Sequence, residues 1–446
     1  MTTLDDIPRI DEAISLGLQR GLVEPGQAQR VRLVARLGTT IDVVEGWTKP
    51  VSGMALARDL GISRAAVHKH VTKLRNLGFL VQAVTGNGYR LEAPFADLLV
   101  GEAVLPMLLG APERVDGTAA GGAADFGFWP GACGCLREGK FLAGVPYFFE
   151  DRAESTNLHL KAGAPRGLSD GALAVTDHQV GGRGRLGRRW VSAPGKDLTF
   201  SVLLRPSLLP AQAQLLSLAA AVAVAETLEA LPGVQSKRPG AALLAALVAA
   251  PEARWGASAA KAGGGAAWPT ASGAGPKVMV KWPNDVLLGG GKVCGILLEG
   301  SMDSDRLQWA IAGMGLNVNG SPRQALEACG EDCSGRPAPV SLREYLGKDV
   351  PRGWLLARLL ERLTVRWNEL ETGHPTPGCA DLMSALRERD VLAGSSVIVR
   401  SGLRGGDVVA SGVAAGIGPE GQLLVREQSG EQKAVFAGEV TLASVS

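Results

Sequence analysis

The sequence predicts an α+β protein of several domains, and three patterns support this class. Residues 52–92 follow the order helix, turn, helix and hairpin, which is typical of a winged helix-turn-helix. The middle of the chain mixes strand-like apolar runs with one long apolar run that looks helical. From about Arg389 onward, apolar and polar residues alternate between turn residues, which predicts a small β-barrel-like domain.

The chain is long enough for two to four domains, and its overall charge does not attract anions. It has 446 residues, 46% of them hydrophobic, and 46 basic residues offset 44 acidic ones. The N-terminus is acidic and no apolar run reaches the length of a bilayer span, so we expect a cytoplasmic protein with no membrane partner. The close cysteine pairs have no nearby histidine, so we expect reduced thiols and no metal held by the protein alone.

The winged helix-turn-helix is built around a second helix that begins at Ser63. Ser63 caps this helix, apolar residues at spacings of three and four point to a core, and Gly86-Asn87-Gly88 turns the hairpin. The other face of the helix is basic, which suits phosphates and base edges in the major groove, although a merely solvated face is the alternative. The expected DNA contacts are Ser63, Arg64, Ala65, His68, Lys69 and Lys73.

Helices are expected before this module, and segments of low complexity after it. Residues 11–20 and 25–37 look helical, and the second of these is expected to complete a three-helix core. Two later segments are rich in Gly and Ala, which is typical of linkers and insertions. We therefore expect a winged helix at 1–92, a linker at 93–145, a central domain at 146–388 with an insertion at 233–276, and a β domain at 389–446.

A glycine-rich loop with the sequence GGRGRLGRRW spans residues 181–190. Its Gly-x-Gly-x-x-Gly spacing would bind a dinucleotide if a helix followed it, but a strand-like run begins soon after Pro194-Gly195 and leaves no room for one. The glycines allow an anion to approach the backbone, and arginines supply forked cationic donors. The loop is therefore interpreted as a phosphate or carboxylate site, with a solvated arginine loop as the alternative.

Several motifs together resemble the biotin protein ligases, of the bifunctional type that also represses the biotin operon. They are GRGRLGRRW, KWPNDVLL followed by KVCGILLE, STN, GMGLNVN, and the helix ISRAAVHKHVTKLRNLG with its GNGYRL wing. The resemblance runs from about Val31 to the C-terminus, apart from the two Gly/Ala-rich segments, and the pairing of GRGRxGR with KWPND is highly specific. It implies a class II synthetase-like central domain and an SH3-like C-terminal β-barrel.

The resemblance also implies a reaction in two steps. Biotin and ATP, with Mg²⁺ on the triphosphate, form biotinyl-5′-AMP and pyrophosphate, and a lysine of a biotin carboxyl carrier protein then attacks the adenylate. Biotin contacts are implied for Ser155, Thr156, Asn157, Gln179, Arg183, Gly184, Arg185 and Lys292. Nucleotide contacts are implied for Arg185, Arg188, Trp190, Asn284 and Asn317, and catalytic roles for Arg183, Lys281, Asp285 and Lys292.

Particular roles follow from these matches. Lys292 is expected to be the main electrostatic stabiliser, and Asp285, which would lie near the metal, is hypothesised to help deprotonate the acceptor lysine. By contrast, Trp282-Pro283 is interpreted as a packing and turn element, and Cys294 as an apolar filler of a strand. GMGLNVN either is a simple strand turn or lies beside the nucleotide.

The resemblance implies that the adenylate orders loops, that two chains then dimerise, and that paired winged helices bind two half-sites of an operator. One alternative is a ligase whose winged helix does not regulate transcription. Another is a DNA-binding biotin sensor without turnover, against which Lys292, Arg183 and Asp285 argue, and a lipoate ligase fits the motifs less well. The insertion before KWPND and the divergent segment after GMGLNVN bear on the coupling to DNA more than on the chemistry.

Overall fold

The computed structural model describes residues 7–19, 23–37, 41–42, 47–92, 97–109, 146–231, 233–234, 278–303, 306–330, 336–373, 379–402 and 406–443. Most of the expected linker and of the expected insertion lies outside the described residues. Internal contacts divide the chain into two compact units: Met1–Asp151, Gly167–Thr176 and Val350–Thr364 form the first, and Arg152–Arg166, Asp177–Asp349 and Val365–Ser446 the second. These units do not follow the expected domain bounds, which stay a prediction.

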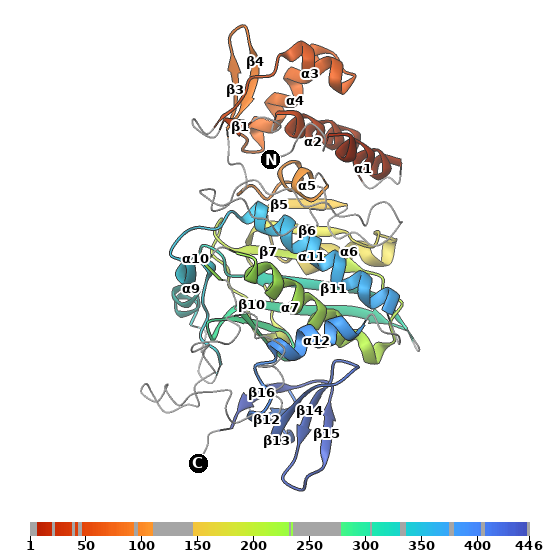
Figure 1. Ribbon diagram of the computed structural model, residues 1–446, viewed down its shortest axis with the longest axis vertical. Coiled ribbons are helices and arrows are strands. Elements are labelled where there is room, and N and C mark those ends of the chain that lie inside the picture. Colours follow the sequence, from red (N-terminus) through yellow and green to blue (C-terminus); the bar gives the residue numbers. More distant parts are fainter. Residues whose placement is uncertain are drawn as a thin grey trace, which may run out of the picture. The chain divides into compact units, whose positions relative to one another are not determined.

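The first unit contains the winged helix-turn-helix (Figure 1). Its elements are α1 (Ile7–Gln19), α2 (Pro25–Leu37), β1 (Ile41–Asp42), β2 (Trp47–Thr48), α3 (Gly53–Leu60), α4 (Arg64–Asn76), β3 (Val81–Val84) and β4 (Gly88–Leu91). Ser63 caps α4 as predicted, because its Oγ accepts a hydrogen bond from the Ala66 amide at 3.1 Å. Leu33 of α2, Leu56 of α3 and Val67 of α4 are fully buried in one core, which confirms that α2 completes it.

A further helix, α5 (Gly101–Leu109), lies inside the segment that was expected to be linker. The sequence pattern did not reveal it because its residues are almost uniformly apolar and include Pro106, which removes the helical periodicity. Glu102 of α5 is buried and pairs with Arg30 of α2 at 2.7 Å. The chain after the wing is therefore packed against the helical core rather than free of it.

The central sheet has seven strands in the order β5-β6-β7-β11-β10-β9-β8. These strands are β5 (Tyr147–Ala153), β6 (Leu173–Gln179), β7 (Leu198–Leu204), β8 (Val278–Lys281), β9 (Asp285–Leu288), β10 (Gly291–Met302) and β11 (Leu307–Leu316). Ser201 of β7 and Leu297 of β10 both pair with Gly313 of β11, and side chains of directly paired residues share a face of the sheet. Gly313 lies on the face that is packed against α6 (Thr156–Gly163), where it is next to Asn157.

Helix α7 (Ala213–Glu229) packs on β8 to β11 and crosses the sheet in Figure 1. Together with residues 210–212 it is long and apolar enough to cross a membrane, but 78% of that stretch is buried inside the protein, as in the core helix of a folded domain. Arg389 of α12 (Cys379–Arg389) forms an ion pair at 2.7 Å with Glu229, the last residue of α7. Trp367 of α11 (Arg352–Gly373) donates from Nε1 to the Leu216 carbonyl of the same helix at 3.2 Å.

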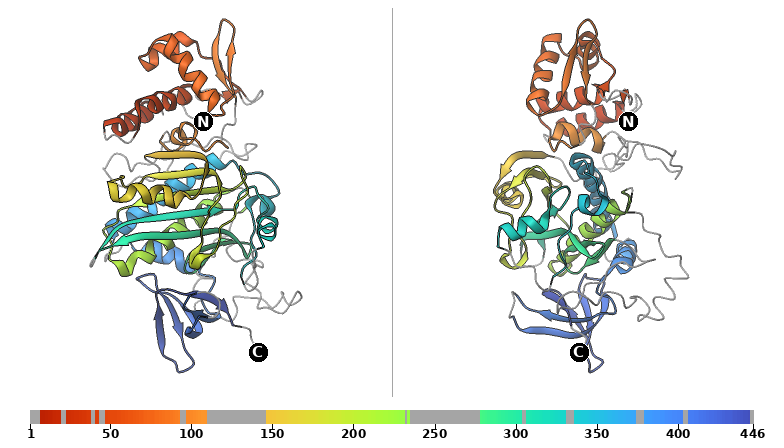
Figure 2. Two further views of the ribbon diagram at one scale, coloured as in Figure 1. Left: turned by 180° about the vertical axis from the view of Figure 1, so that it is seen from behind. Right: turned by 90° about the vertical axis from the view of Figure 1, so that its left-hand side faces the viewer.

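The C-terminal strands form a separate antiparallel sheet, visible in both views of Figure 2. Its order is β15-β14-β13-β12-β16, with β12 (Ser396–Arg400), β13 (Val408–Ile417), β14 (Leu423–Arg426), β15 (Gln432–Val435) and β16 (Glu439–Leu442). The expected turn at GPEG joins β13 to β14, where the Gly421 amide bonds to the Gly418 carbonyl at 2.9 Å. A winged helix, a central mixed fold and a final sheet confirm the α+β class.

Candidate active site

One pocket in the second unit is lined by every residue that the sequence assigned to biotin, to the nucleotide or to catalysis. Its walls come from the start of α6, the loop after β6, the β8–β9 hairpin, β10, β11 and the start of β16. Segments far apart in the sequence therefore meet at one place. Lining a pocket does not assign a role, so the individual roles stay predictions.

The arginine loop is held in shape by its own backbone. The Gly184 amide donates to the Arg188 carbonyl at 2.8 Å, and the Trp190 amide donates to the Gly182 carbonyl at 3.0 Å. Leu186 and Gly187 both have a left-handed backbone, with φ of 58° and 72°, and Leu186 is the only non-glycine residue with positive φ in the described chain. Only a three-residue 3₁₀ turn, Arg185–Gly187, interrupts the path to β7, which confirms that this loop is no dinucleotide fingerprint.

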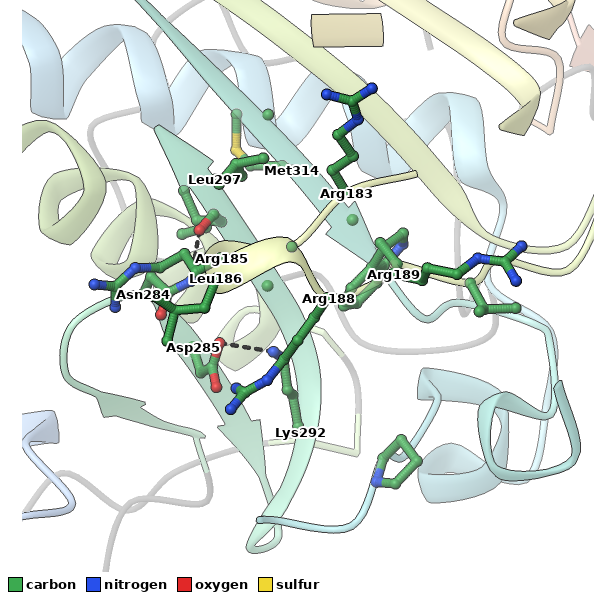
Figure 3. Close-up of a pocket in the computed structure, with 18 of the residues that line it drawn as sticks. Arg183, Arg185, Leu186, Arg188, Arg189, Asn284, Asp285, Lys292, Leu297 and Met314 are labelled. Atoms are coloured by element: carbon green, nitrogen blue, oxygen red, sulfur yellow. Dashed lines mark hydrogen bonds and ion pairs between the residues drawn. The ribbon is translucent and has the colours of Figure 1, made fainter. Parts of the chain in front are cut away.

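The arginines of the loop point in different directions (Figure 3). Arg188 forms an ion pair with Glu439 at the start of β16, and Arg185 lies 3.5 Å from the Gly438 carbonyl. Burial lowers the pKa of Arg185, while the charge of Asp285 opposes this change. The side chain of Arg183 is exposed and extends away from the pair formed by Asp285 and Lys292, so the structure does not bring it to the predicted reacting groups.

The β8–β9 and β9–β10 hairpins assemble a cluster of charge. Lys281 of β8 and Asp285 of β9 lie opposite each other in the register of the first hairpin. Lys292 of β10 forms an ion pair with Asp285, in which Nζ lies 2.8 Å from Oδ1. Burial lowers the pKa of Lys281 to about 8, with Asp285 opposing the change and Lys292 adding to it. Burial alone would raise the pKa of Asp285, but Lys292 and Lys281 outweigh it and hold that pKa below its usual value.

This cluster predicts a pH dependence for the first chemical step. Lys281 has a pKa of about 8 in the ligand-free protein, so it is positive below pH 8 and loses its charge above it. We expect the kcat/KM for ATP to fall as the pH rises through about 8, whereas kcat falls at higher pH because bound phosphates raise the pKa of Lys281. Lys281→Arg should move the kcat/KM limb to higher pH, and an unchanged profile in this variant would remove Lys281 from the step.

A polar wall closes the opposite end of the pocket. The Thr156 amide donates to Gln179 Oε1 at 3.0 Å, and Thr156 Oγ1 lies 2.6 Å from Ser201 Oγ. Ser155 precedes α6 and makes no capping bond with its side chain. These side chains and amides offer hydrogen-bond donors and acceptors at this end of the pocket.

Trp190 lines the pocket between the charged cluster and the polar wall. A Cβ atom on Gly315 would come within 2.1 Å of the indole, so only glycine leaves room for the ring there. Lys292 Nζ lies 5.6 Å from the ring centroid, and the indole Nε1 is buried without a hydrogen-bond partner. Trp190 thus links the charged cluster to the apolar part of the pocket.

The two asparagines that were predicted to contact the nucleotide use their amide groups within the protein. Asn284 Nδ2 donates to the Ile296 carbonyl at 2.7 Å, and Asn317 Nδ2 donates to the Val340 carbonyl at 3.2 Å. Lys292 pairs with the same segment, because its amide donates to the Ala338 carbonyl at 2.8 Å. These asparagines therefore position the strands that carry the charged cluster, and their contact with a nucleotide stays a prediction.

Sequence reasoning missed several residues that shape the pocket. The buried carboxylate of Asp197 accepts hydrogen bonds from the amides of Ala193, Val318 and Gly320 at 2.7, 3.0 and 3.2 Å, and so holds the turn after GMGLNVN. Arg336 also lines the pocket. An acidic residue directly before a strand was the one available signal for Asp197, and nothing in the sequence indicated its partners.

The predicted DNA-binding residues lie together on one face of α4 and at its cap. Arg64, Lys69 and Lys73 are exposed, as Ser63, Ala65 and His68 are. His68 Nδ1 lies 3.2 Å from the hydroxyl of Tyr89 on the wing, which ties the helix to the hairpin. The basic face is therefore available to an anionic partner.

A cationic pocket on the central sheet and a winged helix in the same chain are the features of an anion-activating enzyme with a DNA-binding module. Residues 151–317 match the biotin/lipoate A/B protein ligase family, and residues 47–90 match an HTH domain. The chain is 31% identical to a biotin–[acetyl-CoA-carboxylase] ligase of Paracoccus denitrificans, over 63% of this chain and 94% of that protein. The chain belongs to the biotin/lipoate A/B protein ligase family.

Two further comparisons cover more of the chain. It is 27% identical to the bifunctional ligase/repressor BirA of Bacillus spizizenii, over 88% of this chain and 94% of that protein. The biotin protein ligase from Aquifex aeolicus in complex with biotin and ATP is similar at a TM-score of 0.45 and 23% identity, covering 66% of this chain and 97% of that chain.

Proposed function

We propose that the protein is an ATP-dependent biotin protein ligase. It forms biotinyl-5′-AMP from biotin and ATP, and it transfers biotin to a lysine of the biotin carboxyl carrier protein of acetyl-CoA carboxylase. The observation that carries this proposal is the cluster of Lys281, Asp285 and Lys292 in one pocket with the arginine loop. Family membership and the named ligase relatives support it.

The first step brings a carboxylate against an α-phosphate, so its main obstacle is the repulsion of two anions. Lys292 is only partly buried, and its Nζ reaches into the pocket, where a positive charge offsets both groups. Asp285 holds that ammonium in place through its Oδ1 atom. Lys281, opposite Asp285 on β8, adds a second positive charge. The arginine loop, which contains Gly184 and Gly187, supplies further donors, and loop movement upon ligand binding would bring Arg183 closer.

The triphosphate would enter with Mg²⁺, and Asp285 fits such an ion. The described residues hold no group of three His, Cys, Asp or Glu side chains that could bind a metal by themselves. Mg²⁺ characteristically takes one or two carboxylates and substrate phosphates, so a single carboxylate beside the nucleotide is sufficient. The ion would neutralise charge on the phosphates, and Asp285 is the side chain that would hold it.

Asp285 also suits a second task, because its carboxylate lies in the pocket and the two lysines keep it ionised by lowering its pKa. An ionised carboxylate can accept a proton from the attacking acceptor lysine. If Asp285→Asn transferred biotin from preformed adenylate at the wild-type rate, Asp285 would have no role in this second step.

The proposal is tested with the carrier protein itself. Purified enzyme, ATP, Mg²⁺, biotin and a biotin carboxyl carrier domain should give a carrier that is heavier by one biotinyl group on a single lysine, as measured by mass spectrometry. Lipoate in place of biotin is the matched control and should give no product. Modification by lipoate alone would contradict the assignment and favour a lipoate ligase.

We propose in addition that the protein represses biotin-synthesis genes. The relatives named as ligase/repressor align with 88% of the chain, including its HTH domain, and the exposed basic face of α4 supports DNA binding. The adenylate-bound protein would dimerise, so that two winged helices meet two half-sites of an operator. Both proposed activities need ATP, carrier protein or DNA, so the proposal includes a cytoplasmic location.

Repression is tested by enrichment of genomic fragments on the purified protein at physiological salt, because basic modules bind any DNA at low salt. We expect fragments upstream of biotin genes to be enriched only with biotin, ATP and Mg²⁺, and sedimentation to show a dimer under the same conditions. Carrier biotinylation without any enrichment would leave the enzyme as a ligase whose winged helix does not regulate biotin genes.

A further inference from the structure

A chain of hydrogen bonds leads from the polar wall of the pocket into the protein. It ends at a carboxylate to which no role has been assigned. Ser201 Oγ donates to Asn157 Oδ1 at 2.6 Å, and Asn157 Nδ2 donates to Glu299 Oε2 at 2.8 Å. Glu299 lies on β10 and forms an ion pair with Lys161 of α6 at 3.3 Å. At its other end the chain reaches Thr156, whose Oγ1 lies 2.6 Å from Ser201 Oγ.

The middle of this chain is closed to water. Ser201 is 0% exposed, Thr156 3% and Asn157 5%. A Cβ atom on Gly313 would lie 2.1 Å from Asn157 Oδ1, so the amide packs directly on the backbone of β11. Each group must therefore bond to its neighbours, because an unpaired buried polar group is costly.

The carboxylate fixes the direction of every bond in the chain. An ionised carboxylate only accepts, so Asn157 must turn its amide nitrogen to Glu299 and its oxygen to Ser201. Ser201 then donates its single hydroxyl proton to Asn157 Oδ1. Two oxygens that are 2.6 Å apart need a proton between them, so Thr156 must donate its own hydroxyl proton to Ser201.

Thr156 is thereby left with no proton to offer a ligand. Thr156 Oγ1 also lies 3.4 Å from Gln179 Oε1, but the proton is needed in the much shorter contact of 2.6 Å with Ser201, and Gln179 Oε1 already accepts from the Thr156 amide. The Oγ1 atom of Thr156 therefore meets the pocket as an acceptor. We propose that Glu299 is a positioning residue that acts through Asn157 and Ser201 to hold Thr156 as an acceptor, and so selects ligands that present an N–H group there. This inference rests on the proposed biotin ligase function, because a ureido ring presents two such groups.

An exchange of carboxylate and amide tests the direction of the chain without changing its shape. In Glu299→Gln, the new amide can donate to Asn157, so the chain can reverse and Thr156 can point its proton at the ligand. In Asn157→Asp, two carboxylates would face one another. With both substitutions, position 157 carries the acceptor and position 299 the donor, so Ser201 and Thr156 again donate in the original direction.

We expect Glu299→Gln to raise the KM for biotin about tenfold in pyrophosphate release, with the KM for ATP unchanged. Asn157→Asp should be impaired more strongly, and the double variant should return to within about threefold of wild type, because charge-assisted bonds of the right polarity are restored. Glu431→Gln removes a negative charge from an exposed position directly before β15 and should not change either KM.

A ligand probe gives the second readout. Two cyclic carbamate analogues of biotin, each with one ureido N–H replaced by a ring oxygen, should be rejected by the wild type and by the double variant. For the analogue that lacks the N–H facing Thr156, this discrimination should shrink about tenfold in Glu299→Gln, because the hydroxyl of Thr156 can then donate to the ring oxygen.

The outcomes separate the inference from the function on which it rests. Impaired single variants with a restored double variant support it. A wild-type KM in Glu299→Gln, or a double variant as poor as the single ones, overturns the positioning role while the ligase function stands. A wild-type protein that releases no biotin-dependent pyrophosphate overturns the ligase function and this inference with it.

Discussion

Lys292→Met should lose adenylate formation by about a thousandfold in kcat/KM, because it removes the positive charge that the pocket presents to two reacting anions. The side chain of methionine is similar in length, so the packing against Trp190 can be kept. Asp285 would also lose its ion-pair partner, which adds an unpaired carboxylate to the site. Biotin-dependent pyrophosphate release measures this loss.

Two controls show whether charge is the cause. Lys292→Arg keeps a cation at the same position and should recover part of the rate, with a higher KM because guanidinium geometry differs from that of ammonium. Melting temperatures should show that all variants are folded. A Lys292→Met enzyme within tenfold of wild type would contradict the proposed electrostatic role.

The second large effect concerns DNA. Arg64→Ala with Lys69→Ala should abolish the enrichment of operator fragments at physiological salt and lower the slope of log affinity against log salt by about two, because two phosphate contacts are lost. Both side chains are exposed on α4, so the fold should not change. Carrier biotinylation should proceed at the wild-type rate, because neither residue lies in the ligase pocket.

The matched control removes the same charge elsewhere. Arg426→Ala with Lys433→Ala takes two exposed cations from the C-terminal sheet and leaves α4 intact. This variant should bind operator fragments as the wild type does. Equal losses in both double variants would show that net charge, rather than the face of α4, governs binding.

The sequence predicted the elements whose signals are local. The cap at Ser63 and the hairpin turn at Gly86-Asn87-Gly88 each depend on a few neighbouring residues, and the structure confirms them. The motifs quoted for the central domain meet in one pocket because each of them lies at or near an end of a strand of the central sheet.

What could not be predicted depends on contacts between distant residues. Arg188 meets Glu439, and Asn157 meets Glu299, across more than a hundred residues of sequence. Glu439 lies in no pattern that distinguishes it from a solvated surface charge, and the motif KVCGILLE ends at Glu299 without indicating its partner. The helix α5 was missed because burial on most sides leaves no polar stripe in its sequence.

The direction of Arg183 is a further limit of local reasoning. The motif places this residue in the right loop, but the backbone at Leu186 and Gly187 sends neighbouring arginines to different sides. The structure thus separates Arg188, which is held by Glu439, from Arg183, which is exposed. Sequence alone assigned them to one anion site.

The most direct test of the central claim is the release of pyrophosphate from ATP by the full-length protein with Mg²⁺, measured with and without biotin. Our account predicts release that depends on biotin, saturates with it and disappears in Lys292→Met. Release that does not depend on biotin, or no release from a folded protein, would contradict the assignment of this pocket to biotin adenylation.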